Sequence, residues 1–237
     1  MENKIVLAIM QLKGISRKTI LKSFSLKSGL NCDVATIQEE LKKASIEDGK
    51  VKIYSEHEIR EAIDKANNII QDSEINGIEI VTYLDNLYPF KLKNINDPPT
   101  VLYYKGNIAP LNTMHSVAIV GTREPTEFGF KIAKNLGSSF GKRKYVVVSG
   151  LAVGCDTGAH EGCLGEGGIT VAVMAGGLDK IYPAKNKHLA QRIIDSGGAL
   201  ISEYPIHMGI FRNFFVERDR LQSGLSDGVL VVETAEK

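Results

Sequence analysis

The second half of the chain repeats one pattern: a short apolar segment, a glycine-containing turn, and a stretch long enough for a helix. The apolar segments are rich in β-branched residues, and they span residues 116–120, 145–149, 169–175, 199–203 and 229–233. Strands that are apolar along their whole length suit a parallel sheet covered on both faces. Their alternation with helices of roughly 10 to 16 residues is typical of α/β folds. We therefore predict a Rossmann-like, mostly parallel sheet with helices on both faces.

The first part of the chain has helical rather than strand periodicity. Ile5, Ile9 and Leu12 fall on one helical face, and Ser55 precedes a longer amphipathic stretch as a candidate N-cap. Two further short strands are expected between this region and the repeated pattern. The predicted domains are residues 1–75, which are all helical, and residues 76–237, in which 76–112 extend a sheet core at 113–237.

Composition excludes several classes of protein. No apolar run approaches the ~20 residues that span a bilayer, and no signal peptide is present, so a cytoplasmic protein without a membrane partner is expected. The cysteines Cys32, Cys155 and Cys163 form no CxxC pair, so we expect small buried side chains, no metal and no cofactor. The formal net charge is +1, so any binding of nucleic acid must depend on a local patch.

Two glycine turns carry the strongest functional signal. Gly121-Thr122-Arg123 follows one predicted strand, and Ser149-Gly150-Leu151 follows the next. Ligands of open α/β sheets bind outside the carboxyl ends of the strands, where helix N-termini offer free N–H groups to anions. The Arg123 guanidinium adds a forked donor suited to phosphate oxygens. The sequence therefore favours a phosphate-binding site at each turn over turns that are merely tight, although neither GxGxxG nor a GK[ST] loop is present.

Two later segments point the same way. Lys185, Asn186 and Lys187 lie where a helix is expected to begin, and the helix dipole disfavours cations there. A nearby anion would explain these lysines, although solvation is the commoner explanation. Arg218 and Arg220 follow Phe214-Phe215, a mixture of arginine and aromatic side chains that suits bases and phosphates. A helix with buried aromatics and solvated arginines is an equally good interpretation.

Taken in order, these segments resemble the DprA/Smf family of DNA-processing proteins. The resemblance runs from about residue 76 to the end and includes the turns above, Ala159-His160, Gly176-Gly177-Leu178-Asp179, Tyr182-Pro183 and Gly224-Leu225-Ser226. It implies a protein without catalytic activity that binds single-stranded DNA regardless of sequence, protects incoming strands during natural transformation, and helps to load a recombinase of the RecA type. The DNA-binding residues that it implies are Gly121, Thr122, Arg123, Ser149, Gly150, Leu151, Asn186, Lys187, Arg218 and Arg220.

The family often carries a small helical domain ahead of its sheet domain. Residues 12–16 loosely resemble the turn of a helix-hairpin-helix motif, so the first domain is expected to be of the SAM or helix-hairpin-helix type. A plain helical turn is the simpler interpretation of these residues.

The chain departs from the family at two places. Asp219 stands where the family usually has Asn, and its carboxylate would repel DNA unless Arg218 or Arg220 pairs with it. The family also continues beyond a strand like the one at 229–233, so the resemblance implies a domain that is C-terminally incomplete here, in a truncated or shortened form. Those later elements contribute to a homodimer surface and to the recombinase contact, and both features are therefore open for this chain.

Two other functions use the same fold. Asp156 and His160 lie one helical turn apart and could form an acid/base pair, as a nucleotide N-glycosidase would need, but a capping Asp156 and a packed His160 are the more economical interpretation. A sensor that binds a nucleotide ligand in the same pocket is the other alternative. Such a sensor should saturate with a mononucleotide, whereas a strand-binding protein should gain affinity with length.

Overall fold

Seven apolar segments form strands in the part of the chain that the computed structural model describes, which is residues 2–23, 30–48 and 52–234. Each coincides with a strand predicted from the sequence. They join one sheet in the order β1-β2-β6-β5-β4-β3-β7. The strands are β1 (Glu79–Thr82), β2 (Val101–Gly106), β3 (Ser116–Val120), β4 (Val146–Ser149), β5 (Thr170–Met174), β6 (Ala199–Ser202) and β7 (Gly228–Val231).

The centre of the sheet is parallel. β6, β5, β4, β3 and β7 pair in parallel, and β2 pairs antiparallel with β6. In the register, Ala118 of β3 lies opposite Val148 of β4 on one side and Val229 of β7 on the other. β4 and β5 are buried along their whole length, as expected of strands covered on both faces. The predicted fold class, a Rossmann-like and mostly parallel sheet flanked by helices, is confirmed.

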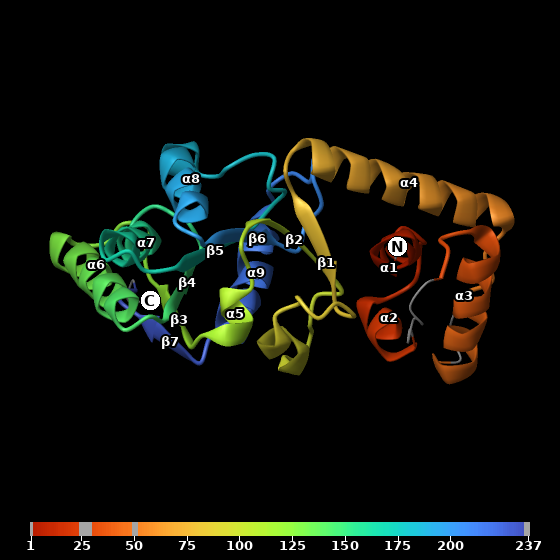
Figure 1. Ribbon diagram of the computed structural model, residues 1–237, viewed down its shortest axis with the longest axis horizontal. Helices are drawn as coiled ribbons and strands as arrows, with labels where there is room; N and C mark the ends of the chain where they lie inside the picture. The colour runs from red at the N-terminus through yellow and green to blue at the C-terminus, as the bar shows by residue number, and fades with distance from the viewer. Residues whose placement is uncertain (1, 24–29, 49–51, 235–237) are drawn as a thin grey trace. The chain divides into compact units, whose positions relative to one another are not determined.

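Four helices connect the parallel strands (Figure 1). The chain steps from β3 through β4 and β5 to β6 in one direction, and then returns to place β7 on the other side of β3. Right-handed crossovers in opposite directions put their helices on opposite faces, so the last helix covers the face that the first three leave open. The helices are α6 (Glu127–Lys142), α7 (Cys155–Gly165), α8 (Lys187–Asp195) and α9 (Arg212–Gly224).

The strand order therefore reverses between β3 and β7. In open α/β sheets, the connections to neighbouring strands run on opposite faces at such a point and leave a crevice outside the carboxyl ends of the strands. The first predicted glycine turn follows β3, and the second follows the neighbouring β4. The topology thus brings both turns to the same edge of the sheet.

Glycines let α6 and α7 lie unusually close together. A Cβ atom on Gly137 of α6 would stand 2.1 Å from the carbonyl oxygen of Ala159, and one on Gly162 of α7 would stand 1.9 Å from that of Lys134. Real Cβ atoms do not approach backbone oxygens so closely, so these positions accept no side chain unless the helices separate. Because α6 follows the Arg123 turn and α7 follows the Gly150 turn, this contact also sets the distance between the two turns.

In the described residues before position 76 the regular elements are helices, and those that the periodicity predicts are among them. Ser55 caps the longest one: its hydroxyl accepts from the Glu58 N–H, and the Glu58 carboxylate accepts from the Ser55 N–H, which is a complete capping box. The sequence did not single out the third helix, which begins after Asp33, whose carboxylate accepts from the Thr36 N–H. The helices are α1 (Glu2–Met10), α2 (Arg17–Ser23), α3 (Val34–Asp48) and α4 (Glu56–Ile75).

Three short helical segments complete the described chain: η1 (Phe90–Asn94), α5 (Pro110–Thr113) and η2 (Ala184–Asn186). The chain divides into two units, Met1–Tyr88 with Asp97–Leu102 and Pro89–Asn96 with Tyr103–Lys237. The domain boundary at residue 75 stays a prediction. No helix in the described residues has the length and apolarity to cross a bilayer.

Candidate functional site

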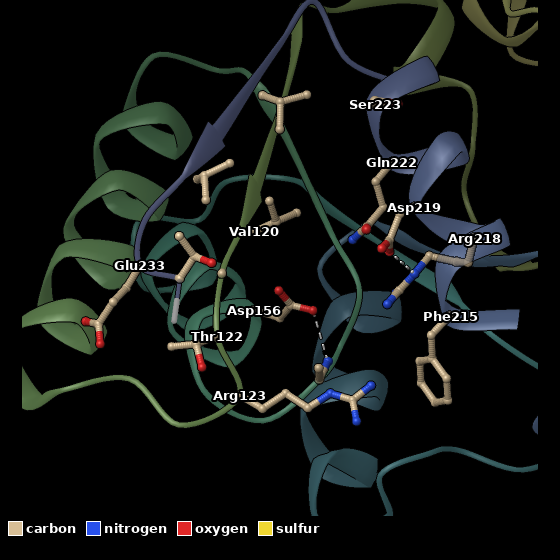
Figure 2. Close-up of a pocket in the computed structure, with 15 residues that line it drawn as sticks. Val120, Thr122, Arg123, Asp156, Phe215, Arg218, Asp219, Gln222, Ser223 and Glu233 are labelled. Carbon is tan, nitrogen blue, oxygen red and sulfur yellow. Dashed lines mark hydrogen bonds and ion pairs between the residues drawn. The ribbon is translucent and has the colours of Figure 1, made fainter. Parts of the chain in front are cut away.

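A pocket of about 500 Å³ lies where the strand order reverses (Figure 2). Its walls come from the turn after β3, the turn after β4, the strand β7 and the pocket-facing side of α9. The lining residues are Val120, Gly121, Thr122, Arg123, Ala152, Asp156, Phe215, Arg218, Asp219, Gln222, Ser223, Val229, Val231, Glu233 and Thr234. Of the predicted site residues, the structure thus gathers Gly121, Thr122, Arg123 and Arg218 around one cavity.

The turn after β3 is held by its neighbours. The Thr122 N–H donates to the Glu233 carbonyl at 2.8 Å, and the Thr122 carbonyl accepts from the Cys155 N–H at 3.2 Å. A Cβ atom on Gly121 would stand 2.6 Å from the Cys155 sulfur. Packing against α7 therefore explains why position 121 is a glycine, and a bound phosphate is not needed to explain it.

Arg123 is the exposed cation of the pocket. Its guanidinium carbon lies 4.7 Å from the centroid of the Phe215 ring, a cation–π contact, and Figure 2 shows the side chain extending across the mouth of the pocket toward that ring. Within the described part of the chain Arg123 forms no ion pair. Phe215 was not among the predicted site residues, although the mixture of arginine and aromatic residues at 214–220 pointed to it. The site thus combines a free planar cation with a half-buried aromatic ring.

A carboxylate already occupies the N-terminus of α6. Glu233, just beyond β7, accepts hydrogen bonds from the Thr126 N–H at 3.0 Å and from the Thr126 hydroxyl at 2.9 Å. The same hydroxyl caps the helix by accepting from the Gly129 N–H. In this structure Glu233 therefore takes the place near α6 in which the sequence predicts a phosphate.

The turn after β4 also holds a carboxylate. Asp156 accepts from the Gly150 N–H at 3.1 Å and from the Ala152 N–H at 3.2 Å. Burial raises the pKa of Asp156, and the nearby Arg218 opposes that rise. Asp156 thus stabilises the loop that precedes α7, and the expectation that it caps its own helix is wrong. The Gly150 amide, expected to meet a phosphate, donates to Asp156 instead.

Two other residues of this turn have internal roles. The Ser149 hydroxyl is buried and donates to the Ile119 carbonyl at 2.6 Å. Leu151 is buried at a φ of +58°, in the left-handed region. Both side chains therefore shape the turn, and a direct contact of either with DNA stays a prediction.

Arg218 lies beneath the pocket and is almost completely buried. Its Nη1 donates to the Val173 carbonyl, and its Nε donates to the Asp219 carboxylate at 3.1 Å. The pairing that the sequence required to neutralise Asp219 is therefore present. A Cβ atom on Gly150 would stand 2.0 Å from Nη1, so glycine at position 150 makes room for this arginine.

Six of the ten predicted residues do not line this pocket: Ser149, Gly150 and Leu151 of the second turn, and also Asn186, Lys187 and Arg220. Arg220 forms an ion pair with Glu203 at the end of β6. The buried amide of Asn186 donates to the Leu151 carbonyl at 2.8 Å and to the Thr157 hydroxyl at 2.9 Å, and so ties the segment before α8 to the second turn. Lys187 is exposed at the start of α8. A contact of these residues with DNA also stays a prediction.

The structure does not join Asp156 and His160 as an acid/base pair. His160 is fully buried, and its Nδ1 lies 2.7 Å from the Thr170 hydroxyl. Burial, with a smaller contribution from Arg218, lowers the pKa of His160 to about 3. A histidine without access to the pocket serves packing, as the more economical interpretation held. Cys155 and Cys163 are buried as expected, but Cys32 is only partly buried, against the expectation. Within the described residues no cluster of His, Cys, Asp or Glu could hold a metal ion.

Known proteins match this chain in sequence over most of its length. The family model of DNA recombination-mediator protein A matches residues 79–237. The chain is 36% identical over 181 residues to DNA processing protein DprA of Bacillus subtilis, covering 76% of this chain and 61% of that protein. It is also 36% identical over 197 residues to protein Smf of Synechocystis, covering 80% of this chain and 49% of that protein. The chain therefore spans about half to three fifths of the length of these relatives.

Two solved structures are similar to the chain. The X-ray structure of DNA processing protein A from Streptococcus pneumoniae superposes with a TM-score of 0.77 at 28% identity, covering 100% of this chain and 80% of that one. A structure of DNA processing protein A from Helicobacter pylori, which is described by its single-stranded-DNA-binding mode, gives a TM-score of 0.59 at 31% identity. It covers 68% of this chain and 71% of the other.

Proposed function

Because the chain belongs to the DNA recombination-mediator protein A family, we propose that it binds single-stranded DNA, without sequence preference, at the pocket between β3 and β7. The observation that carries the proposal is the contact between Arg123 and Phe215 at the mouth of that pocket. The single-stranded-DNA-binding mode described for the Helicobacter pylori relative supports the choice of ligand.

Arg123 and Phe215 offer two complementary surfaces to a nucleotide. A base gains about 1–3 kcal/mol by stacking on an aromatic side chain, whatever its identity, because every base has a π-face. The guanidinium of Arg123 can stack on a base or donate two hydrogen bonds to one phosphate. A site built from stacking and phosphate contacts does not discriminate between sequences, which suits a protein that handles any incoming strand.

The charge of the pocket decides where a phosphate can lie. Asp156, Asp219 and Glu233 contribute three carboxylates to its lining, against the guanidiniums of Arg123 and Arg218. Asp156, Glu233 and Arg218 bond within the protein, so Arg123 at the mouth is the cation left to meet an anion. We therefore place the backbone of the strand at the mouth of the pocket, beside Arg123, and a base against the Phe215 ring.

Membership of the family supports a proposal for the biological role. We propose that the protein protects single strands and assists a recombinase of the RecA type during natural transformation, and that it acts by binding rather than by catalysis. The internal roles of Asp156 and His160 support a binding function over nucleotide N-glycosidase activity. The homodimer that the resemblance suggests belongs to the same proposal.

The experiment that tests DNA binding is fluorescence anisotropy with a series of labelled oligo-dT strands. We expect affinity to rise with length, and Arg123→Ala to weaken binding about tenfold or more, which corresponds to about 1.4 kcal/mol. Arg192→Ala removes another exposed arginine, on α8, and serves as the matched control.

Competitors separate the alternatives in the same assay. An unlabelled single strand should displace the probe, whereas duplex DNA should compete poorly. Saturation by a mononucleotide, with no gain from added length, would support the sensor instead. Equal loss in Arg123→Ala and Arg192→Ala would refute the assignment of the site.

A further inference from the structure

Tyr182 extends the aromatic surface of the pocket beyond Phe215. The two ring centroids lie 6.0 Å apart with an interplanar angle of 62°, an edge-to-face contact. Phe215 in turn carries the Arg123 guanidinium over its ring. Three segments far apart in the sequence thus supply one continuous series, Arg123, Phe215 and Tyr182, of which only the first two have a role in the proposed pocket.

Tyr182 is not a core residue, because about half of its surface is exposed. Its side chain is 48% accessible to solvent, although its ring contacts another aromatic residue. An aromatic ring that is half exposed beside a proposed nucleotide site is suited to stacking on a planar ligand. Tyr182 lines none of the pocket between β3 and β7, so its exposed surface lies outside that cavity.

The segment that carries Tyr182 is anchored at both ends. Before it, the Asp179 carboxylate accepts from the His207 N–H at 3.1 Å. After it, the buried Asn186 amide bonds to Leu151 and Thr157. A ring held by an anchored segment loses little conformational freedom when a base stacks on it, which favours binding.

The same segment carries lysines suited to a phosphate backbone. Lys180, Lys185 and Lys187 are all exposed, and none forms an ion pair within the described residues. Two carboxylates, Glu127 and Glu161, line a cavity together with Lys185. The three lysines outnumber these two acids, and the carboxylate of Asp179, just before the segment, is already bonded to His207.

We propose that Tyr182 is a second base-stacking platform, and that single-stranded DNA leaves the pocket over the edge formed by Phe215 and Tyr182 and continues along residues 180–187. The inference rests on the proposed function, since it extends the same binding site by further nucleotides. It predicts that strands too short to reach Tyr182 bind without it, and that longer strands depend on it.

The first test compares affinity at different strand lengths. Tyr182→Ala should bind dT2 as the wild type does and should lose about tenfold in affinity for dT8 and longer strands. Tyr182→Phe should retain wild-type affinity at every length, because it keeps the ring. A loss of the same size at every length would overturn the proposal by showing that Tyr182 only supports Phe215, and wild-type affinity of Tyr182→Ala for all strands would overturn it outright.

The second test detects stacking directly. The chain contains no tryptophan, so Tyr182→Trp introduces a single tryptophan at the proposed platform, and its emission can be excited selectively over that of the tyrosines. Its emission should be quenched by dT8 but not by dT2, whereas Phe90→Trp, at a half-exposed position on η1, should respond to neither strand. Unchanged emission with dT8, while anisotropy shows that dT8 binds, would refute the platform and leave the proposed function standing. Failure of the wild type to bind any strand would refute both.

Discussion

Three arginines of the predicted site have three different environments. Arg123 is exposed at the mouth of the pocket, Arg218 is buried beneath it, and Arg220 is paired with Glu203. Arg218 and Arg220 are two residues apart on α9, and residues at that spacing do not share a helix face. The sequence pattern identified all three as cations near the ligand. The orientation of α9 buries Arg218 and directs Arg220 toward Glu203, which leaves Arg123, on the turn after β3, available.

The buried His160 predicts a measurable dependence of stability on pH. Its pKa is about 3 in the folded protein and about 6.5 in an unfolded chain. Below pH 6.5 the unfolded chain takes up a proton that the folded protein does not, so the free energy of unfolding falls as the pH falls toward 3, and the full contribution is present above pH 6.5. Between pH 7.5 and pH 5.5 this residue should cost about 1.4 kcal/mol of stability.

Urea denaturation of the wild type and of His160→Gln at these two pH values checks this prediction. The variant should be less stable at pH 7.5, because it disturbs the bond to Thr170, but its stability should change less between the two pH values. The other histidines are unchanged in the variant, so their contributions cancel in the comparison. Parallel pH profiles for the two proteins would contradict the prediction.

At the scale of the elements, the contact between α6 and α7 contributes to the position of both turns, together with the pairing of β3 with β4. A Cβ atom on Gly162 would stand 1.9 Å from the Lys134 carbonyl oxygen, whereas one on Gly165, three residues later on α7, would meet nothing within 4 Å. The two glycines therefore form a natural pair of test positions on one helix.

Gly162→Ala should destabilise the protein by about 2 kcal/mol or more, because the added methyl group forces the helices apart. Gly165→Ala should leave stability unchanged or raise it by about 0.5 kcal/mol, since alanine restricts the unfolded chain. Thermal denaturation followed by circular dichroism measures both. Similar melting temperatures for the two variants would show that the helices adjust freely, against the close packing described above.

The sequence predicted the elements of the sheet better than it predicted the helices before it. The strands were found because a parallel strand must be apolar along its length, and that pattern is visible locally. Helix α3 was not singled out, although Ile37, Leu41 and Ala44 are buried at helical spacing, because it lies among mostly polar and charged residues. Burial of that stripe depends on neighbouring helices, which a local pattern does not contain.

The position of the candidate site could be predicted from the sequence, but the groups that bond to its backbone amides could not. The turns after β3 and β4 meet at the reversal of strand order, as the topology of α/β sheets requires. However, backbone N–H groups at those turns already donate hydrogen bonds to the carboxylates of Glu233 and Asp156. Glu233 lies 107 residues from Thr126, so no spacing rule could connect the two.

At the scale of the whole molecule, a net charge of +1 limits how DNA can bind. A protein without a broad basic surface gains little from general attraction to phosphates, so affinity must come from a few local contacts and from stacking. The proposed DNA path runs from the pocket over Phe215 and Tyr182 and along residues 180–187, and we call it the track. Its cations are Arg123 and the lysines at 180–187. About three or four phosphate contacts are therefore expected.

This number predicts the salt dependence of binding. For single strands, the slope of log K against log salt is about −0.7 per phosphate contact, which gives a total of about −2 to −3 here. Anisotropy titrations with dT8 at several salt concentrations measure the slope, and Arg123→Ala should make it shallower by about 0.7. A slope near zero would exclude phosphate contacts, and a slope much steeper than −3 would require a basic surface beyond the track.

The glycine contact between α6 and α7 also bears on attempts to engineer the protein. A designer who wished to widen the pocket for a bulkier or modified base would first vary the residues that line it. Those changes can enlarge the cavity at its α9 wall, but they would leave the separation of the two turns almost unaltered, because the backbone contact between α6 and α7 maintains that separation. Positions 137 and 162, which do not line the pocket, are the ones at which that separation can be changed, and every increase there carries a loss of stability.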